Sequence, residues 1–336
     1  MRRRIGSILS RIVGNRAVAA GVHRPMKTTV PVLMLLLVAL SACRAIGGAP
    51  PSGSPPPSEG DAGIEHPTGA QPILVVDWQG GFVPVESMPT RTPAFVLYGD
   101  GRVIMLGAQT LEYPGPALPP LMQRTLNDSG VQAVLSAVTD TGLFDVDLRL
   151  DGAMNVVADV NDTVFTLTAE GREVTVSVYG LGMLMPDMDL PTISAEELEA
   201  HQTLGELNSS LMMLEEWLPE DAWLDESWQT YEADAFRLYV RDVTDQPVGD
   251  DGLTPQVRDW PADDDPAAFG TEQSLFGDGT RCGAVSGEAG ATWGSELNSA
   301  KQTTVWTDDG DRRFSIAARP LLPHDGVTCP EPFDGA

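Results

Sequence analysis

Three pairs of apolar segments, each joined by a short turn, constrain this fold more than any other feature of the sequence. The pairs are residues 94–98 with 102–106, residues 164–168 with 174–178, and residues 303–306 with 313–317. Their connections contain Gly99-Asp100-Gly101, Glu170-Gly171 and Asp308-Asp309-Gly310-Asp311. Glycine in such turns supplies the positive φ that a tight hairpin requires. The pattern predicts three β-hairpins, and hence antiparallel sheets. Further strands are expected at residues 73–76, 121–126, 236–243 and 280–285.

Helical spacing predicts one helix after each of the first two hairpins. Residues 131, 134, 135 and 138 are apolar, with Asn127, Asp128 or Ser129 as N-cap and Gly142 beyond the end. The second helix starts with a capping box formed by Ser194 and Glu197 and stops at Pro219. Its leucines, at 204, 207, 211, 214 and 218, form one stripe. The stripe suits core packing, with a groove for a partner helix as the alternative.

A third helix is expected from a Ser286 cap to Ala300, with Trp293 and Leu297 on its inner side. Hairpins interleaved with single helices predict an α+β fold, in which antiparallel hairpins pack against single helices in two lobes. The expected organisation is a signal peptide (1–42), a tether (43–72), a first lobe (73–218), a connector (219–231) and a second lobe with a disulfide (232–333).

The N-terminus has the character of an export signal. Residues 1–27 carry seven basic residues and no acidic one, and an apolar run of 11 residues follows, Val30 to Leu40. A bilayer core requires about 20 apolar residues, so this run is too short to span it and fits a cleaved signal. Translation starts at Met1 or at Met26, because Met26-Lys27 begins a compact signal by itself.

The four residues that end this signal, Leu40-Ser41-Ala42-Cys43, resemble the bacterial lipobox. The resemblance implies a bacterial lipoprotein that is cleaved before Cys43 and carries a diacylglyceryl group, such as one with palmitate chains, on that sulfur. It also implies a location at the cell membrane, on the extracytoplasmic side. Two or three acyl chains hold a protein far more firmly than one, since each buried CH₂ contributes about 0.8 kcal/mol.

The composition of the chain after the signal predicts a flexible tether and a strongly acidic surface. Residues 44–72 are rich in Gly, Pro and Ser and contain too few apolar residues to form a core, so they are expected to act as a tether. The part after residue 42 contains 48 acidic and 14 basic residues, a net charge of −34. Such a surface repels nucleic acid phosphates and anionic headgroups. We therefore expect lipid rather than charge to hold the protein to the membrane, and no nucleic acid partner.

Two cysteines follow Cys43, namely Cys282 and Cys329. In an exported chain a lone pair predicts one disulfide. It would close a loop of roughly 47 residues, for which the chain-entropy model gives about 4 kcal/mol.

The sequence contains weak candidates for catalytic or metal chemistry. A catalytic triad would need His201 or His324, the latter next to Asp325, together with a serine. Ser286 lacks the glycines of a nucleophile elbow. Asp159, Asn161 and Asp162 resemble the start of a calcium loop, and Glu170 falls at the twelfth position, but Val164 stands at the sixth, which requires glycine. The sequence thus predicts no catalytic residues and leaves Ca²⁺ as a candidate ion.

The run Phe95 to Ile104, together with Arg281-Cys282 and the ending Arg319-Pro320-Leu321-Leu322-Pro323 before Cys329, resembles uncharacterised lipoproteins of high-GC bacteria. That group has no known activity, so the resemblance implies export and a shared fold without site residues. We expect a non-enzymatic binding module at the cell envelope, whose partner is an envelope protein, a polymer or a small ligand. An envelope hydrolase and a calcium-dependent surface adhesion module are the alternatives.

Overall fold

The alternating apolar segments of the sequence form two β-sheets in a computed structural model of the chain. The structure describes residues 63–84, 87–155, 157–184, 193–247, 254–273 and 279–329. The expected signal peptide, Cys43 and the first twenty residues of the expected tether lie outside these ranges. All described residues belong to one compact unit.

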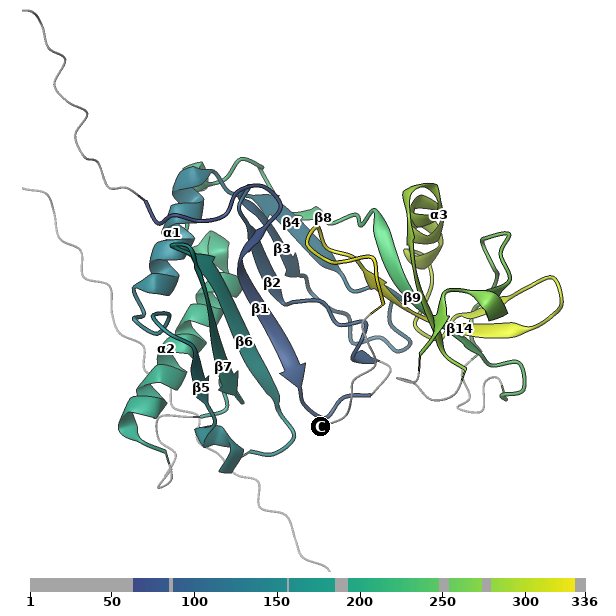
Figure 1. The fold of residues 1–336 in the computed structure, drawn as a ribbon, viewed down its shortest axis with the longest axis horizontal. Coiled ribbons are helices and arrows are strands. Elements are labelled where there is room, and N and C mark those ends of the chain that lie inside the picture. Colours follow the sequence, from purple (N-terminus) through teal and green to yellow (C-terminus); the bar gives the residue numbers. More distant parts are fainter. Residues whose placement is uncertain are drawn as a thin grey trace, which may run out of the picture. The chain divides into compact units, whose positions relative to one another are not determined.

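The first sheet contains eight strands in the order β5-β7-β6-β1-β2-β3-β4-β8 (Figure 1). The hairpins expected at 94–106 and 164–178 are confirmed as β2–β3 and β6–β7. In the first of them Gly101 has φ +83°, and a Cβ there would lie 2.2 Å from the carbonyl oxygen of Leu126, so the turn requires glycine. The strands are β1 (Pro72–Gly80), β2 (Phe95–Tyr98), β3 (Arg102–Leu106), β4 (Leu121–Thr125), β5 (Leu148–Leu150), β6 (Asn161–Ala169), β7 (Arg172–Tyr179) and β8 (Gln229–Thr230).

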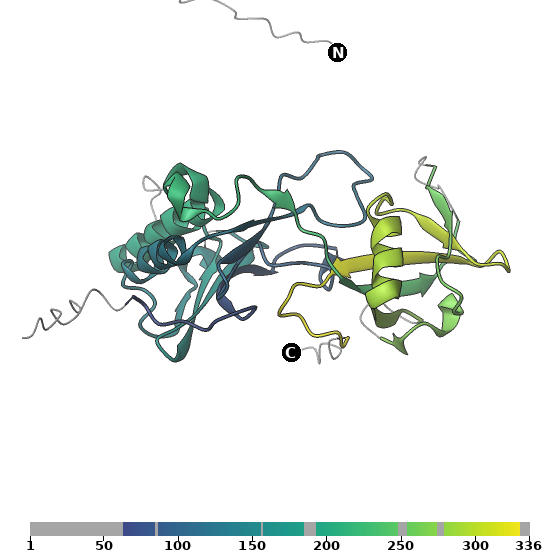
Figure 2. The ribbon, with the colours of Figure 1, turned by 90° about the horizontal axis from the view of Figure 1, so that it is seen from above.

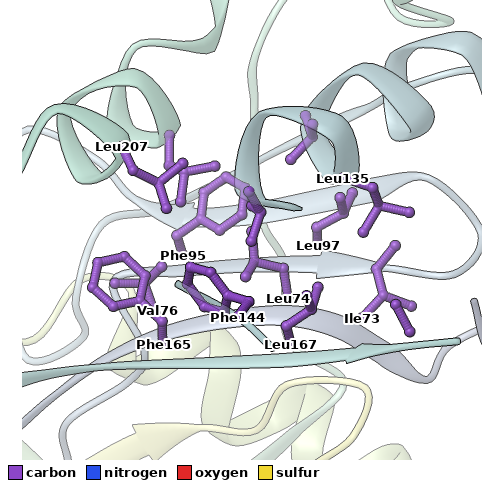
Figure 3. Close-up of a cluster of buried hydrophobic side chains, with 14 of the residues drawn as sticks. Ile73, Leu74, Val76, Phe95, Leu97, Leu135, Phe144, Phe165, Leu167 and Leu207 are labelled. Atoms are coloured by element: carbon purple, nitrogen blue, oxygen red, sulfur yellow. The ribbon is translucent and has the colours of Figure 1, made fainter. Parts of the chain in front are cut away.

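Two helices, α1 (Asp128–Thr139) and α2 (Ala195–Met212), cover one face of the first sheet. Their apolar residues meet those of the central strands in a core in which Leu135 and Leu207 lie over Phe95, Leu97 and Leu74 (Figure 3). The side chain of Asn127 caps α1 by accepting from the amide of Gly130. The leucine stripe of α2 is buried in this same core, which supports the packing interpretation over the partner-helix one.

Two details of α2 differ from expectation. The helix ends at Met212, not at Pro219, and a single 3-10 turn follows, Leu214–Glu216. Only half of the expected capping box forms. Ser194 accepts from the amide of Glu197, while the Glu197 carboxylate accepts from the amide of Gly152. Glu197 is thus used to fasten the segment after β5 to the start of α2, a long-range contact that the local motif does not encode.

The second sheet has six strands in the order β10-β13-β14-β9-β12-β11. The third expected hairpin is confirmed as β13–β14, and one helix, α3 (Gly287–Leu297), covers one face of β9 and β12 (Figure 2). Trp293 and Leu297 are buried as expected. Ser286 occupies the N-cap position of α3 and is the last residue of β12, but its side chain does not form the expected capping hydrogen bond. The strands are β9 (Ala235–Asp242), β10 (Val257–Asp259), β11 (Thr271–Glu272), β12 (Arg281–Ser286), β13 (Val305–Thr307) and β14 (Arg313–Pro320).

The fold is α+β, as the sequence predicted, with strands in the majority and three α-helices among the described residues. The sheets are mixed rather than purely antiparallel, because β5 pairs with β7 and β10 pairs with β13 in parallel. The strands at the sheet edges, β5, β8, β10 and β11, are only two or three residues long. Strands this short carry no readable apolar alternation, which explains why the sequence did not predict them.

The C-terminal segment, residues 321–329, is fastened at several points. The predicted disulfide is confirmed between Cys282 of β12 and Cys329, with the Cα atoms 6.1 Å apart. Leu322 packs with apolar residues of β2, β3 and β4. The Tyr98 hydroxyl and the His324 Nδ1 lie 2.8 Å apart, and the Tyr231 hydroxyl donates to the carbonyl of Leu321. The segment therefore contacts residues of both sheets.

The chain before β1 is also held in place from Gly63 onward. The amide of Ile64 donates to the Gln132 side chain of α1, and the amide of Glu65 donates to the carboxylate of Glu170.

Within the described ranges, no helix combines the length and the apolar character that crossing a membrane requires.

Candidate ligand groove along strand β4

The candidate site lies along β4, whose sequence is Leu-Met-Gln-Arg-Thr and whose successive side chains point to opposite faces of the sheet. Leu121 faces the core cluster that contains Leu322, so Met122 and Arg124 point to the opposite face, on which the helices lie. On that face Met122 is the direct cross-strand partner of Met105 in β3. Helix α2 ends at Met212, and the residues after it form one side of a groove above β4.

The groove consists of two hollows that share Glu215. The first, which we name the methionine hollow, has a volume of about 370 Å³ and is lined by Met105, Leu106, Gly107, Met122, Met212–Glu216 and Trp228. The second, which we name the arginine hollow, has a volume of about 500 Å³ and is lined by Arg124, Glu215, Leu218, Glu220 and Trp223–Glu226. We refer to the two together as the β4 groove.

Arg124 holds the arginine hollow together from its floor. Its side chain is buried and stacks over the Trp223 ring, with the guanidinium carbon 4.0 Å from the ring centroid. The guanidinium donates to the Glu215 carboxylate and to the carbonyls of Asp225 and Glu226. A planar fork of donors suits such multiple contacts, so one side chain fixes both sides of the hollow. The contacts of Arg124 therefore fix the two sides of the arginine hollow relative to each other.

The groove combines an apolar lining with an acidic rim. Met213 and Leu224, which line it, remain 44% and 66% exposed. The carboxylates that line it are Glu215, Glu216, Glu220, Asp225 and Glu226, and Arg124 is the one basic residue among the lining residues. Aromatic and methionine side chains are enriched in binding surfaces, and the excess of carboxylates favours a cationic ligand.

Another hollow among the described residues, of about 660 Å³, lies near the start of α2. Leu143, Leu148 and Leu150 line it together with Arg149 and several acidic residues, including Glu197. Arg149 forms an ion pair with Asp151, and Glu197 is bonded to Gly152. Its lining includes Ser194, and residues 185–192 just before it lie outside the described ranges, so we place no site there.

The histidine and serine candidates form contacts other than those of a catalytic triad. His324 pairs with the Tyr98 hydroxyl, and the carboxylate of Asp325 accepts from Arg319 and from the amide of Leu322. Burial lowers the pKa of His324, with the nearby Asp325 opposing this effect. Ser286 belongs to β12, where it pairs with Ala235 of β9. The contacts of His324 and Asp325 are thus structural ones within and around the C-terminal segment.

The calcium candidates lie around the start of β6. Asp159 precedes the strand with φ +61°, while Asn161 and Asp162 are its first two residues and Asp162 forms an ion pair with Arg149 at 3.4 Å. Glu170 follows the other end of the strand, roughly 26 Å from Asp162 at about 3.3 Å per residue, and its carboxylate accepts from Glu65. No group of three or more His, Cys, Asp or Glu side chains suited to a metal occurs within the described ranges. A calcium site here stays a prediction.

Sequence reasoning did not find the residues of the β4 groove. Met212-Met213, between Leu211 and Leu214 of the leucine stripe, was a visible signal, because it places two large, flexible apolar side chains off the stripe. The contacts of Arg124 with residues about 100 positions away were not visible in the sequence.

Comparisons of the sequence and of the fold with known proteins found no match. No protein-family model matches the sequence, no curated protein matches it, and no solved structure matches the fold.

Proposed function

We propose that this chain is a lipid-anchored extracytoplasmic protein that binds a ligand non-enzymatically in the β4 groove. The observation that carries the binding function is the β4 groove itself, whose sides are joined by the buried Arg124. The sequence Leu40-Ser41-Ala42-Cys43 after a short apolar run supports the lipid anchor. The disulfide between Cys282 and Cys329 suits an oxidising compartment outside the cytosol.

The chemistry of the groove indicates the class of ligand. Methionine and tryptophan side chains provide polarizable apolar contact, and five carboxylates surround one arginine that is already paired. A cationic ligand gains Coulomb attraction there, whereas an anionic one is repelled. We therefore expect the ligand to be a soft or apolar cation.

Labelling with palmitate tests the anchor. Cells that express the chain incorporate labelled palmitate into it, and the Cys43→Ala variant incorporates none. Ser41→Thr, which leaves the cysteine in place, serves as the matched control and keeps its label. Recovery of unlabelled wild-type protein from the cytoplasm would contradict the proposal.

Melting temperature tests the binding function, because a ligand that binds only the folded state stabilises it. The lipidated protein in detergent is scanned against a panel of Cu(I), Ag(I), Ca²⁺, a Lys/Leu amphipathic peptide and a soluble peptidoglycan fragment. We expect a rise with a cationic member of the panel that Met122→Arg abolishes, because arginine fills the hollow and repels cations. A rise that Met122→Arg leaves unchanged, or none with any member, would count against the groove as the ligand site.

A further inference from the structure

One hollow of this chain is unusually rich in methionine. Nine methionines follow Cys43 in the sequence, and four of them line the methionine hollow, where they make up four of its ten lining residues. These four are Met105, Met122, Met212 and Met213. Leucine would fill such a space with more sharply defined rotamers than methionine. Four methionines at one hollow therefore suggest that the thioether sulfur atoms themselves have a function.

The backbone brings the four side chains toward a common volume from two directions. Met105 and Met122 are opposite each other across β3 and β4, a relation that places Cβ atoms about 4.5–5.5 Å apart. Met212 is the last residue of α2, and Met213 follows with φ −130° and ψ 48°, outside helical geometry. Because the chain leaves the helix between them, two consecutive residues are able to line the same hollow.

Space for the Met122 side chain is provided by Gly107. A Cβ at Gly107 would lie 2.8 Å from the Met122 Cγ and 3.6 Å from its Sδ. The Met122 thioether thus lies against a residue that has no side chain, at the lining of the hollow. The remaining volume of about 370 Å³ exceeds what a single ion occupies. The flexible methionine side chains can close around a smaller ligand.

Thioether sulfur is a soft, neutral ligand that selects Cu(I) over hard cations. A site of this kind suits an oxidising compartment, because free cysteines there form disulfides, as Cys282 and Cys329 do. The carboxylates of Glu215 and Glu216 also line the hollow and supply the negative potential that attracts a cation.

We propose that the methionine hollow binds Cu(I) through the sulfur atoms of Met105, Met122, Met212 and Met213. This inference rests on the proposed extracytoplasmic binding function and names the ligand of the same groove. Binding involves no change in the oxidation state of copper, because Cu(I) enters and remains as Cu(I).

Anaerobic competition with bicinchoninate tests the proposal on the lipidated protein in detergent. We expect one Cu(I) per chain, and an affinity at least about tenfold weaker in the double variant Met105→Leu/Met122→Leu, because leucine keeps the volume but removes the sulfur. The matched control is Met154→Leu/Met183→Leu, which replaces two exposed methionines that do not line the hollow and keeps the wild-type affinity.

X-ray absorption at the copper edge provides a second readout. Sulfur scatterers in the first coordination shell support the proposal, whereas a shell of nitrogen and oxygen alone overturns it. Unchanged affinity in the Met105→Leu/Met122→Leu variant, with the same melting temperature as wild type, also overturns it. Failure of the copper proposal is distinguishable from failure of the proposed binding function. A chain that does not bind Cu(I), but melts at a higher temperature with another cationic member of the panel in a way that Met122→Arg abolishes, rejects copper and keeps the groove as a ligand site.

Discussion

The two sheets of this protein are built around cores of different size and composition. Among the described residues, the buried cluster of the first sheet has 27 members, four of them aromatic, whereas that of the second has 13, six of them aromatic. A small core buries a smaller fraction of its surface and gains less from the hydrophobic effect. The second sheet compensates with large aromatic side chains and a disulfide, two features that add stability without adding chain length.

The two sheets also differ in the hollows that they offer to a ligand. The β4 groove belongs to the first sheet, where α2 ends short of β4, while the hollow lined by Tyr239, Arg241 and neighbouring residues of the second sheet measures only about 150 Å³. The larger core remains stable although a groove lies open above β4. In the smaller core each side chain contributes a larger share of the stability. This contrast predicts where substitutions cost the most.

The largest effect is expected for Trp293→Ala. Trp293 is fully buried, and its ring contacts those of Trp260 and Trp306, with centroids 4.8 Å and 5.3 Å away. Removing a buried tryptophan side chain costs about 3–5 kcal/mol, and we expect about 5 here because the cluster is small and its partners are rigid rings. Urea unfolding measures the loss. The matched variant in the larger core, Leu204→Ala, is expected to cost about 3 kcal/mol, and an equal or larger loss for Leu204→Ala would break the comparison.

Loss of the disulfide is expected to rank next. In Cys282→Ser/Cys329→Ser the 47-residue separation is no longer closed in the unfolded state, and we expect a loss of about 4 kcal/mol. Urea unfolding with and without a reducing agent measures it. The wild-type protein should lose the same amount on reduction, whereas the double variant should be insensitive to the reductant. Equal stability of the oxidised wild type and the double variant would show that the second sheet does not depend on this bond.

The smallest expected effect concerns His201, which lies in the first core. It is 3% exposed, and within the described part of the chain neither ring nitrogen has a hydrogen-bond partner. An unsatisfied buried polar group costs about 1–3 kcal/mol, so we expect His201→Leu to stabilise the protein by about 1 kcal/mol. The first core, which is the larger of the two, thus tolerates a buried histidine whose ring has no hydrogen-bond partner among the described residues.

The same residue makes stability dependent on pH. Burial lowers the pKa of His201 below 6.5, with Glu197 opposing the shift. The unfolded state therefore binds a proton at a higher pH than the folded state, and stability falls as the pH drops below about 6.5. Thermal unfolding between pH 7 and pH 5 should show a smaller decline in His201→Leu than in wild type. His324 has a lowered pKa of the same sign, so His324→Gln provides the comparison from the C-terminal segment.

Local signals predicted much of this fold. Each hairpin carried its own turn glycine, Asn127 capped α1, and the stripe from Leu204 to Leu218 reached the core even though the helix stopped at Met212. Interactions between distant residues were beyond the sequence. Glu197 bonds to Gly152, Arg124 reaches Asp225, and Met105 meets Met122, and each contact depends on how strands and helices pack. The groove consists almost entirely of such contacts, which is why the fold was predictable and the candidate site was not.

The shortness of the edge strands has a consequence for life on a surface. Proteins confined to a membrane meet copies of themselves more often than proteins in free solution, and exposed backbone donors and acceptors invite strand pairing between them. Here each edge, at β5, β8, β10 and β11, offers at most three residues for such pairing. If the proposed anchor holds many copies side by side, the short edge strands limit strand pairing between neighbouring copies and so disfavour aggregation.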